Sequence, residues 1–149
     1  MQHIRSPYTR KLPHFDVGQA YYHLVFRLRE GHLSEEEIRI TRDHINEGND
    51  QFYRLIAVQV MSNHVHVILQ PSANIKLTEV VRRIKGGSAR KINLIRGTSG
   101  ALWSDKYFDR VIRNQDDLEK TLKYLELNPV KLDAEKDGWN CAGWSFVQE

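Results

Sequence analysis

The chain has 149 residues, of which 40% are hydrophobic and 28% are charged, and this balance is typical of one globular domain with its own core. We therefore expect residues 1–149 to form a single domain. No apolar stretch approaches the roughly 18 residues that cross a bilayer, and the polar N-terminus has no signal-peptide core, so we expect a cytoplasmic protein and no membrane partner. Cys141 is the only cysteine, which excludes an internal disulfide and a multi-cysteine zinc site.

The net charge of +3 says little about partners, but the basic residues are unevenly distributed. The first 15 residues contain Arg5, Arg10 and Lys11 and no acid. Residues 76–96 contain a single acid, Glu79, and seven basic side chains: Lys76, Arg82, Arg83, Lys85, Arg90, Lys91 and Arg96. A basic run is often only a solvated helix face. Two such segments, with most acids placed elsewhere, leave a solvated surface and a polyanion partner as equally open interpretations.

The first third of the chain predicts an arm, a strand and a helix. Residues 1–18 are polar and contain two prolines, which is typical of an extended arm. AYYHLVFRL, residues 20–28, alternates in the manner of a strand. Ser34 followed by Glu37 is a capping box, which predicts a helix from that point to about Gly48.

Two strands and a long helix are predicted next. FYRLIAVQV, residues 52–60, and VHVILQ, residues 65–70, are joined by a short polar link, which predicts a hairpin of antiparallel neighbours. The apolar positions of residues 77–95 predict a helix. Within it, Gly86 and Gly87 are candidates for a break.

A turn, a fourth strand and a last helix complete the predicted order of secondary-structure elements. GTSG at residues 97–100 predicts a turn, and residues 106–112 predict a fourth strand. A last helix is predicted from about Asp116 to a point before Pro129, because proline disfavours helical geometry in the preceding residue. The order of the first six elements predicts a ferredoxin-like α+β fold, with helices on one face of an antiparallel sheet. The other face then needs a cover or a function.

The stretch MSNHVHVILQP places two histidines in an apolar strand. Alternate strand residues share a face, so His64 and His66 would stand roughly 7 Å apart on one side. Two imidazoles at that spacing can share a metal ion, and the same pattern suits a strand whose open face tolerates polar rings. The pair by itself leaves both interpretations open.

A tyrosine on the last helix is equally ambiguous when it is considered alone. Leu118, Leu122 and Leu125 form the apolar stripe of that helix, and Tyr124 lies to one side of it. A tyrosine at such a margin is most often half-buried with its hydroxyl in water.

The two motifs together resemble a known family. NHVHVIL at residues 63–69, with WSDKYFDRVIRNQDDLEKTLKYLELNPVK at residues 103–131, resembles the REP-associated tyrosine transposases. These belong to the IS200-like single-tyrosine transposases, which have an HUH nuclease core. The terminal DGWNCAGWSF is similar to the tryptophan-rich ending of the family. The resemblance thus extends from the first predicted strand to the end of the chain.

The resemblance implies a set of roles. His64 and His66, with Asn128, would bind a divalent metal, Mg or Mn, and Tyr124 would be the catalytic nucleophile. The tyrosine-bearing helix would then lie near the face with the two histidines. The implied activity is DNA transposition and recombination, by cutting and rejoining single-stranded or hairpin DNA through a 5′-phosphotyrosine. Relatives include dimers and monomers, so a homodimer is one expected state.

The basic segments supply the expected DNA contacts. The residues concerned are Arg5, Arg10, Lys11, Arg82, Arg83, Lys85, Arg90 and Lys91. Tyr8, Phe15 and Trp103 are candidates for stacking on unpaired bases, although ordinary packing is the favoured interpretation for each of them.

Three alternatives stay open at this point. The chain could be a catalytically silent regulator that binds hairpin DNA with the same fold. It could be a metal-dependent hydrolase that uses a water nucleophile, for which the further donors would be His32, His44 and Asp105. In the third alternative, the two strand histidines only pack and bind no metal.

Overall fold

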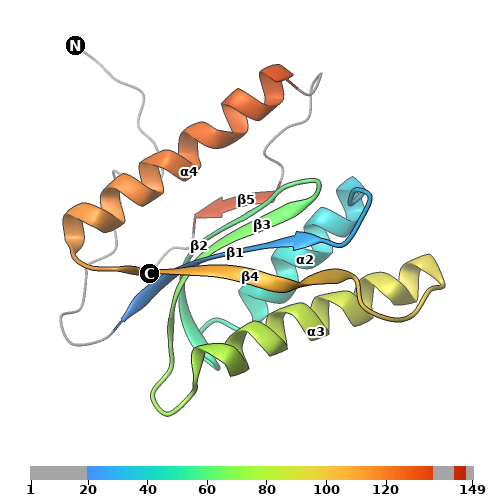
Figure 1. Cartoon of the computed structure of the whole chain (residues 1–149), viewed down its shortest axis with the longest axis horizontal. Helices are drawn as coiled ribbons and strands as arrows, with labels where there is room; N and C mark the ends of the chain where they lie inside the picture. The colour runs from blue at the N-terminus through green and yellow to red at the C-terminus, as the bar shows by residue number, and fades with distance from the viewer. Residues whose placement is uncertain (1–19, 136–142, 147–149) are drawn as a thin grey trace.

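The structure, a computed structural model, describes residues 20–135 and 143–146, and side chains from residue 20 to residue 125. Its elements are β1 (Tyr21–Leu28), α2 (Glu35–Glu47), β2 (Tyr53–Val60), β3 (His64–Pro71), α3 (Leu77–Arg96), β4 (Trp103–Ile112), α4 (Gln115–Glu135) and β5 (Gly143–Phe146). The strands form one sheet in the order β4-β1-β3-β2-β5. Helices α2 and α3 lie on one face of it and α4 on the other (Figure 1). Within the described ranges, no helix has the length and apolar character needed to cross a membrane.

The predicted ferredoxin-like α+β fold is confirmed. All four strand pairings are antiparallel, and β2 and β3 form the expected hairpin, with Val60 opposite Val65. A fifth strand, β5, was not predicted. It has only four residues and adds to the free side of β2, where Ala57 pairs with Phe146. So short a strand carries no periodicity from which a sequence pattern could reveal it.

Two hydrophobic cores lie on the two faces of the sheet. The larger is between the sheet and the helices α2 and α3, and on β3 it includes Val65, Val67 and Leu69. The smaller is between the sheet and α4, and β3 contributes Ile68 to it. Since strand residues alternate between faces, β3 is buried on both sides, and His66 shares the α4 face with Ile68.

The predicted capping box is present and is part of a larger ionic cluster. The backbone N–H of Glu37 donates to Ser34 Oγ at 3.1 Å, and the N–H of Ser34 donates to Glu37 Oε1 at 2.9 Å. The Arg96 guanidinium, at the end of α3, donates to both carboxylate oxygens of Glu37. This hydrogen-bonded partner lowers the pKa of Glu37, so the start of α2 is tied to the end of α3 by an ionised pair.

Gly86 and Gly87 do not interrupt α3, which is continuous from Leu77 to Arg96. A Cβ at position 87 would collide with the ring of His44 on α2, whereas a Cβ at position 86 would meet nothing within 4 Å. The glycine at position 87 therefore allows α2 and α3 to approach closely, and the helix tolerates its low propensity.

The prediction that the last helix ends before Pro129 is wrong, because α4 continues to Glu135. Proline has no N–H with which to bond the carbonyl four residues earlier, that of Leu125. In the structure this carbonyl accepts a hydrogen bond of 2.6 Å from Nε2 of Gln59 on β2. The sheet thus replaces the bond that the proline removes.

Candidate active site of a nucleic-acid enzyme

The two histidines of β3 face the tyrosine helix. The ring centroids of His64 and His66 are 5.1 Å apart, and those of His66 and Tyr124 are 6.4 Å apart. Tyr124 is 54% exposed, while Leu118, Leu122 and Leu125 of the same helix are buried against the sheet. The prediction that the pair opens toward the helix of Tyr124, away from α2 and α3, is confirmed.

A third imidazole, which the sequence did not single out, belongs to this cluster. His23 of β1 stacks on His66 with ring centroids 5.2 Å apart, and His23 Nε2 hydrogen-bonds His66 Nδ1 at 3.0 Å. The pairing register places Val25 opposite His66 and therefore brings His23 beside it. The alternation of side chains along β1 could have identified His23, because it places His23 on the face of the sheet opposite to Leu24 and Phe26.

The ring nitrogens of both β3 histidines are held in a defined way. His64 Nδ1 donates to Asn63 Oδ1 at 2.8 Å, which leaves Nε2 of His64 as the lone-pair nitrogen. When His66 Nδ1 carries the hydrogen of its bond to His23, Nε2 of His66 is likewise a lone-pair nitrogen. Metal-binding histidines are commonly oriented through their other ring nitrogen in this manner.

Burial keeps all three imidazoles neutral. It lowers the pKa of His66 to about 3, with the neighbouring His23 and His64 acting in the same direction. It also lowers the pKa of His64 to about 4, assisted by Arg27, and that of His23 to about 4, assisted by Arg110. At neutral pH the rings are therefore in the form that can donate a lone pair to a metal ion.

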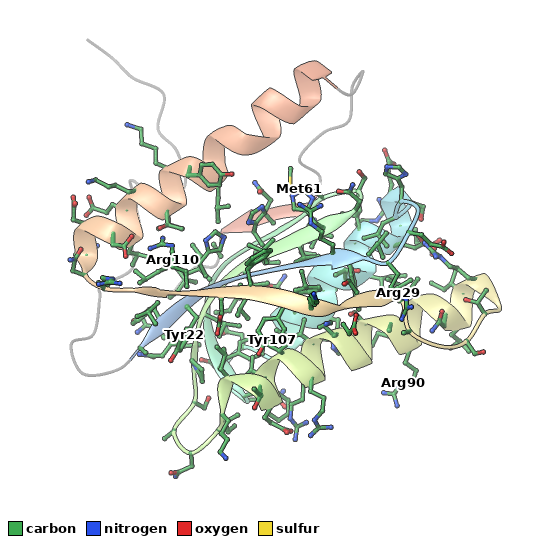
Figure 2. All side chains as sticks on the ribbon, in the orientation of Figure 1. Tyr22, Arg29, Met61, Arg90, Tyr107 and Arg110 are labelled. Carbon is green, nitrogen blue, oxygen red and sulfur yellow. The ribbon has the colours of Figure 1, made fainter. Side chains whose placement is uncertain are left out.

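Arg110 of β4 connects the site to the start of α4 (Figure 2). Its guanidinium donates to both carboxylate oxygens of Asp117 at 3.1 Å and to Thr121 Oγ1 at 2.7 Å. It pairs with His23 in the β1–β4 register, so it lies on the same face of the sheet. Arg110 falls outside both basic segments, so no sequence pattern singled it out.

The other predicted metal donors are placed differently. Asn128 lies in α4 one turn after Tyr124, and its side chain falls outside those that the structure describes. Among residues 20–135 and 143–146, no cluster of three or more His, Cys, Asp or Glu side chains could hold a metal. His44, a donor in the hydrolase alternative, lies on the other face, where its Nε2 is 3.2 Å from the Arg83 carbonyl oxygen.

The predicted DNA contacts of α3 lie on the far side of the sheet from Tyr124 (Figure 1). Several are engaged within the protein: Arg82 and Arg83 pair with Glu79, Lys91 pairs with Glu47, and Lys85 donates to the Ser104 carbonyl. Arg90 projects from α3 away from the sheet (Figure 2). The fold therefore does not bring these residues to the three histidines.

The remaining expected DNA contacts divide into two groups. Arg5, Arg10, Lys11, Tyr8 and Phe15 fall outside the described residues. Trp103 is only 4% exposed, packs edge-on against Phe26 and donates from Nε1 to Ser88 Oγ at 3.0 Å. Trp103 is therefore no candidate for stacking on DNA bases, and the favoured interpretation, ordinary packing, is confirmed for it.

Comparison with known proteins defines the class of this chain. Residues 16–128 match the family described as "Transposase IS200 like", and this match covers most of the chain. The chain belongs to the IS200-like transposase family. No curated protein matches it significantly.

Two solved structures have a fold similar to that of this chain. A REP-associated tyrosine transposase bound to a REP hairpin matches with a TM-score of 0.64 and 17% identity, over 100% of this chain and 94% of the other. A candidate transposase from Deinococcus radiodurans R1 matches with a TM-score of 0.51 and 23% identity, over 78% and 95% of the two chains. At these identities the likeness shows the fold. With the family match, it confirms the predicted resemblance to REP-associated tyrosine transposases.

Proposed function

We propose that this chain is a single-stranded DNA endonuclease and strand-transferase that cuts at hairpin-associated sites, with Tyr124 as its nucleophile. The observation that carries the proposal is the 6.4 Å separation between the ring centroids of Tyr124 and His66. Tyr124 and His66 approach each other within one chain, so the proposed site needs no second copy. A homodimer, which relatives led us to expect, stays a prediction.

The donor set suits a divalent metal. His64 and His66 are neutral, and hydrogen bonds on Nδ1 leave Nε2 of His64, and Nε2 of His66 in the matching tautomer, as lone-pair nitrogens. We propose that these two nitrogens and the amide oxygen of Asn128 hold Mg or Mn. When bound, the ion would supply positive charge to the scissile phosphate.

The covalent chemistry is assigned to Tyr124. Its phenolic oxygen attacks the phosphorus, the bond to the 3′ oxygen breaks, and the leaving oxygen takes up a proton to become a 3′-hydroxyl. The other DNA end stays on the protein as a 5′-phosphotyrosine. A later 3′-hydroxyl can attack this linkage and release Tyr124, so the bond energy is conserved and no nucleotide cofactor is needed.

Hairpin DNA is the proposed substrate because a structural neighbour is a transposase bound to a REP hairpin. The chain's own support is its charge distribution: Arg82, Arg83 and Arg90 line a cavity of about 520 Å³ between α2 and α3. Arg110 adds a cation on the same face as the histidines. We propose that these arginines, with Lys85, Lys91 and the basic arm, contact phosphates.

The test is trapping of the covalent intermediate. The protein is incubated with labelled hairpin DNA that carries a single-stranded foot, in the presence of manganese or magnesium, and is then denatured. We expect a denaturation-resistant adduct that disappears in Tyr124→Phe and in the double variant His64→Ala/His66→Ala, while the double variant still binds the hairpin.

Each other outcome selects an alternative. An adduct that persists in Tyr124→Phe would refute the assignment of the nucleophile. Cleavage without an adduct would favour the hydrolase, and hairpin binding without cleavage would favour the silent regulator.

A further inference from the structure

A buried glutamine on the same face of the sheet has no part in the function proposed above. Gln59 of β2 has no exposed surface, and a buried amide is stable only when it is hydrogen-bonded. Its Nε2 donates to the carbonyl oxygen of Leu125 at 2.6 Å, joining residues 66 positions apart in the sequence. The sheet is therefore bonded to α4 at the residue that follows Tyr124.

Pro129 explains why this carbonyl is available. In a regular α-helix the Leu125 carbonyl would accept from the N–H of residue 129. Residue 129 is a proline within α4, so it has no N–H to donate. An unpaired carbonyl buried against a sheet is costly, and the Gln59 amide satisfies it.

The position of this bond matters because of the neighbour of Gln59 in the sheet. Gln59 and His66 are opposite each other in the β2–β3 register, so their side chains leave the sheet side by side on the α4 face. The hydrogen bond from Gln59 therefore holds Leu125, the neighbour of Tyr124, above Gln59, the neighbour of His66.

The apolar contacts of α4 cannot set this position by themselves. Leu118, Leu122 and Leu125 bury the helix against the sheet, but hydrophobic contact is non-directional and permits small shifts along and around the helix axis. A hydrogen bond has a preferred length and angle, so it selects one axial and rotational position of α4.

We propose that Gln59 is a positioning residue for Tyr124. Pro129 frees the Leu125 carbonyl, and Gln59 binds it, so that α4 rests where the Tyr124 ring lies against His66. The inference depends on the proposed role of Tyr124 as nucleophile. It assigns to the proline of α4 a role that a helix-terminating residue would not have.

The experiment uses three substitutions in the full chain. Gln59→Met keeps the length of the side chain and removes the donor. Gln70→Met is the matched control, since Gln70 is also buried in the sheet but its Nε2 has no hydrogen-bond partner among the described residues. Pro129→Ala restores an N–H that can bond the Leu125 carbonyl within the helix.

The first readout is the single-turnover rate of adduct formation with labelled hairpin DNA and manganese. We expect Gln59→Met to slow it by about tenfold or more, because small misplacements of a nucleophile are costly. In the Pro129→Ala background the same substitution should slow it by less than about threefold, because the carbonyl is then bonded internally. Gln70→Met should react at the wild-type rate, and manganese and hairpin affinities should stay within about twofold in all variants.

The second readout needs neither metal nor DNA. A fluorinated tyrosine at position 124 reports its surroundings by fluorine NMR. We expect its resonance to shift or broaden in Gln59→Met and to match the wild type in Gln70→Met.

The outcomes separate the two proposals. A wild-type rate in folded Gln59→Met, or equal slowing in Gln59→Met and Gln70→Met, overturns the positioning role of Gln59. If the wild type forms no adduct, the proposed function fails and the fluorine spectra decide about Gln59. In that case, a fluorine resonance that changes in Gln59→Met but not in Gln70→Met supports Gln59 as the residue that holds Tyr124 in place. Identical spectra of the wild type and Gln59→Met refute this role.

Discussion

Replacement of His23 by phenylalanine tests the hydrogen bond that His23 makes to His66, one of the two proposed metal-binding histidines. Phenylalanine preserves a flat ring that can stack on His66, as the His23 ring does with centroids 5.2 Å apart. It removes His23 Nε2, which accepts the 3.0 Å hydrogen bond when His66 Nδ1 carries the hydrogen. Without that acceptor, the Nδ1–H tautomer of His66 loses the bond that stabilises it, so a smaller share of the rings keeps a lone pair on Nε2, the nitrogen proposed to bind the metal.

The size of the effect follows from that single bond. A neutral hydrogen bond contributes about 1 kcal/mol net, and outer partners of metal-binding histidines are worth about 10- to 100-fold in affinity. We therefore expect the manganese dissociation constant of His23→Phe to rise by about tenfold, which corresponds to about 1.4 kcal/mol. Isothermal titration calorimetry measures this directly, and nitrogen NMR of His66 reports which ring nitrogen carries the hydrogen.

The matched control is His32→Phe, which removes an exposed histidine outside the cluster. It should leave the manganese affinity unchanged. An affinity in His23→Phe within about twofold of the wild type, with His66 still protonated on Nδ1, would refute the reasoning, because the outer partner would then have no influence on the metal-binding nitrogen.

Three further predictions concern stability. The pKa of His66 is lowered to about 3 from 6.5, so between these values the unfolded chain binds more protons than the folded chain. Urea unfolding should therefore show stability that is fully present above about pH 6.5 and is lost progressively down to about pH 3, less steeply in His66→Gln. Glu37→Gln weakens the buried ion pair of Glu37 with Arg96 and should lower the free energy of unfolding by about 1–3 kcal/mol. Glu47→Gln removes the exposed pair of Glu47 with Lys91 and should lower it by less than about 1 kcal/mol. Equal losses in the two variants would contradict this prediction. Thermal unfolding should show Gly86→Ala stabilised by about 0.5–1 kcal/mol and Gly87→Ala destabilised by about 1–3 kcal/mol, because only the second Cβ meets the histidine ring of α2.

Local patterns were sufficient for much of the fold. The capping box at Ser34 and the alternation along β1 and β3 depend on neighbouring residues only, so the sequence alone places them correctly. The placement of His64 and His66 on one face follows from the same alternation. Tyr124 came from the family resemblance, since its helical position alone predicted nothing beyond partial burial.

The features that were missed depend on contacts between distant segments. His23 enters the cluster through the β1–β3 register, which joins residues 43 positions apart. The continuation of α4 through Pro129 depends on Gln59 in another element. The need for a glycine at position 87, inside a continuous α3, depends on the ring of His44 in α2. A local propensity rule cannot include such partners, so it predicts a helix end or a break in their place.

The sheet separates α3 from Tyr124, and this constrains the path of a bound nucleic acid. A nucleic-acid strand that contacts the arginines of α3 and also enters the site with the histidines must pass around an edge of the β-sheet. The β4 edge offers such a route, because Lys85 of α3 bonds Ser104 near one end of β4 and Arg110 lies farther along the same strand. A straight nucleic-acid strand that lies on one face of the sheet reaches either the arginines of α3 or the histidines. A bent or hairpinned nucleic acid can reach both. A DNA molecule that contacts both sets of residues, as proposed, would therefore have to be bent or hairpinned.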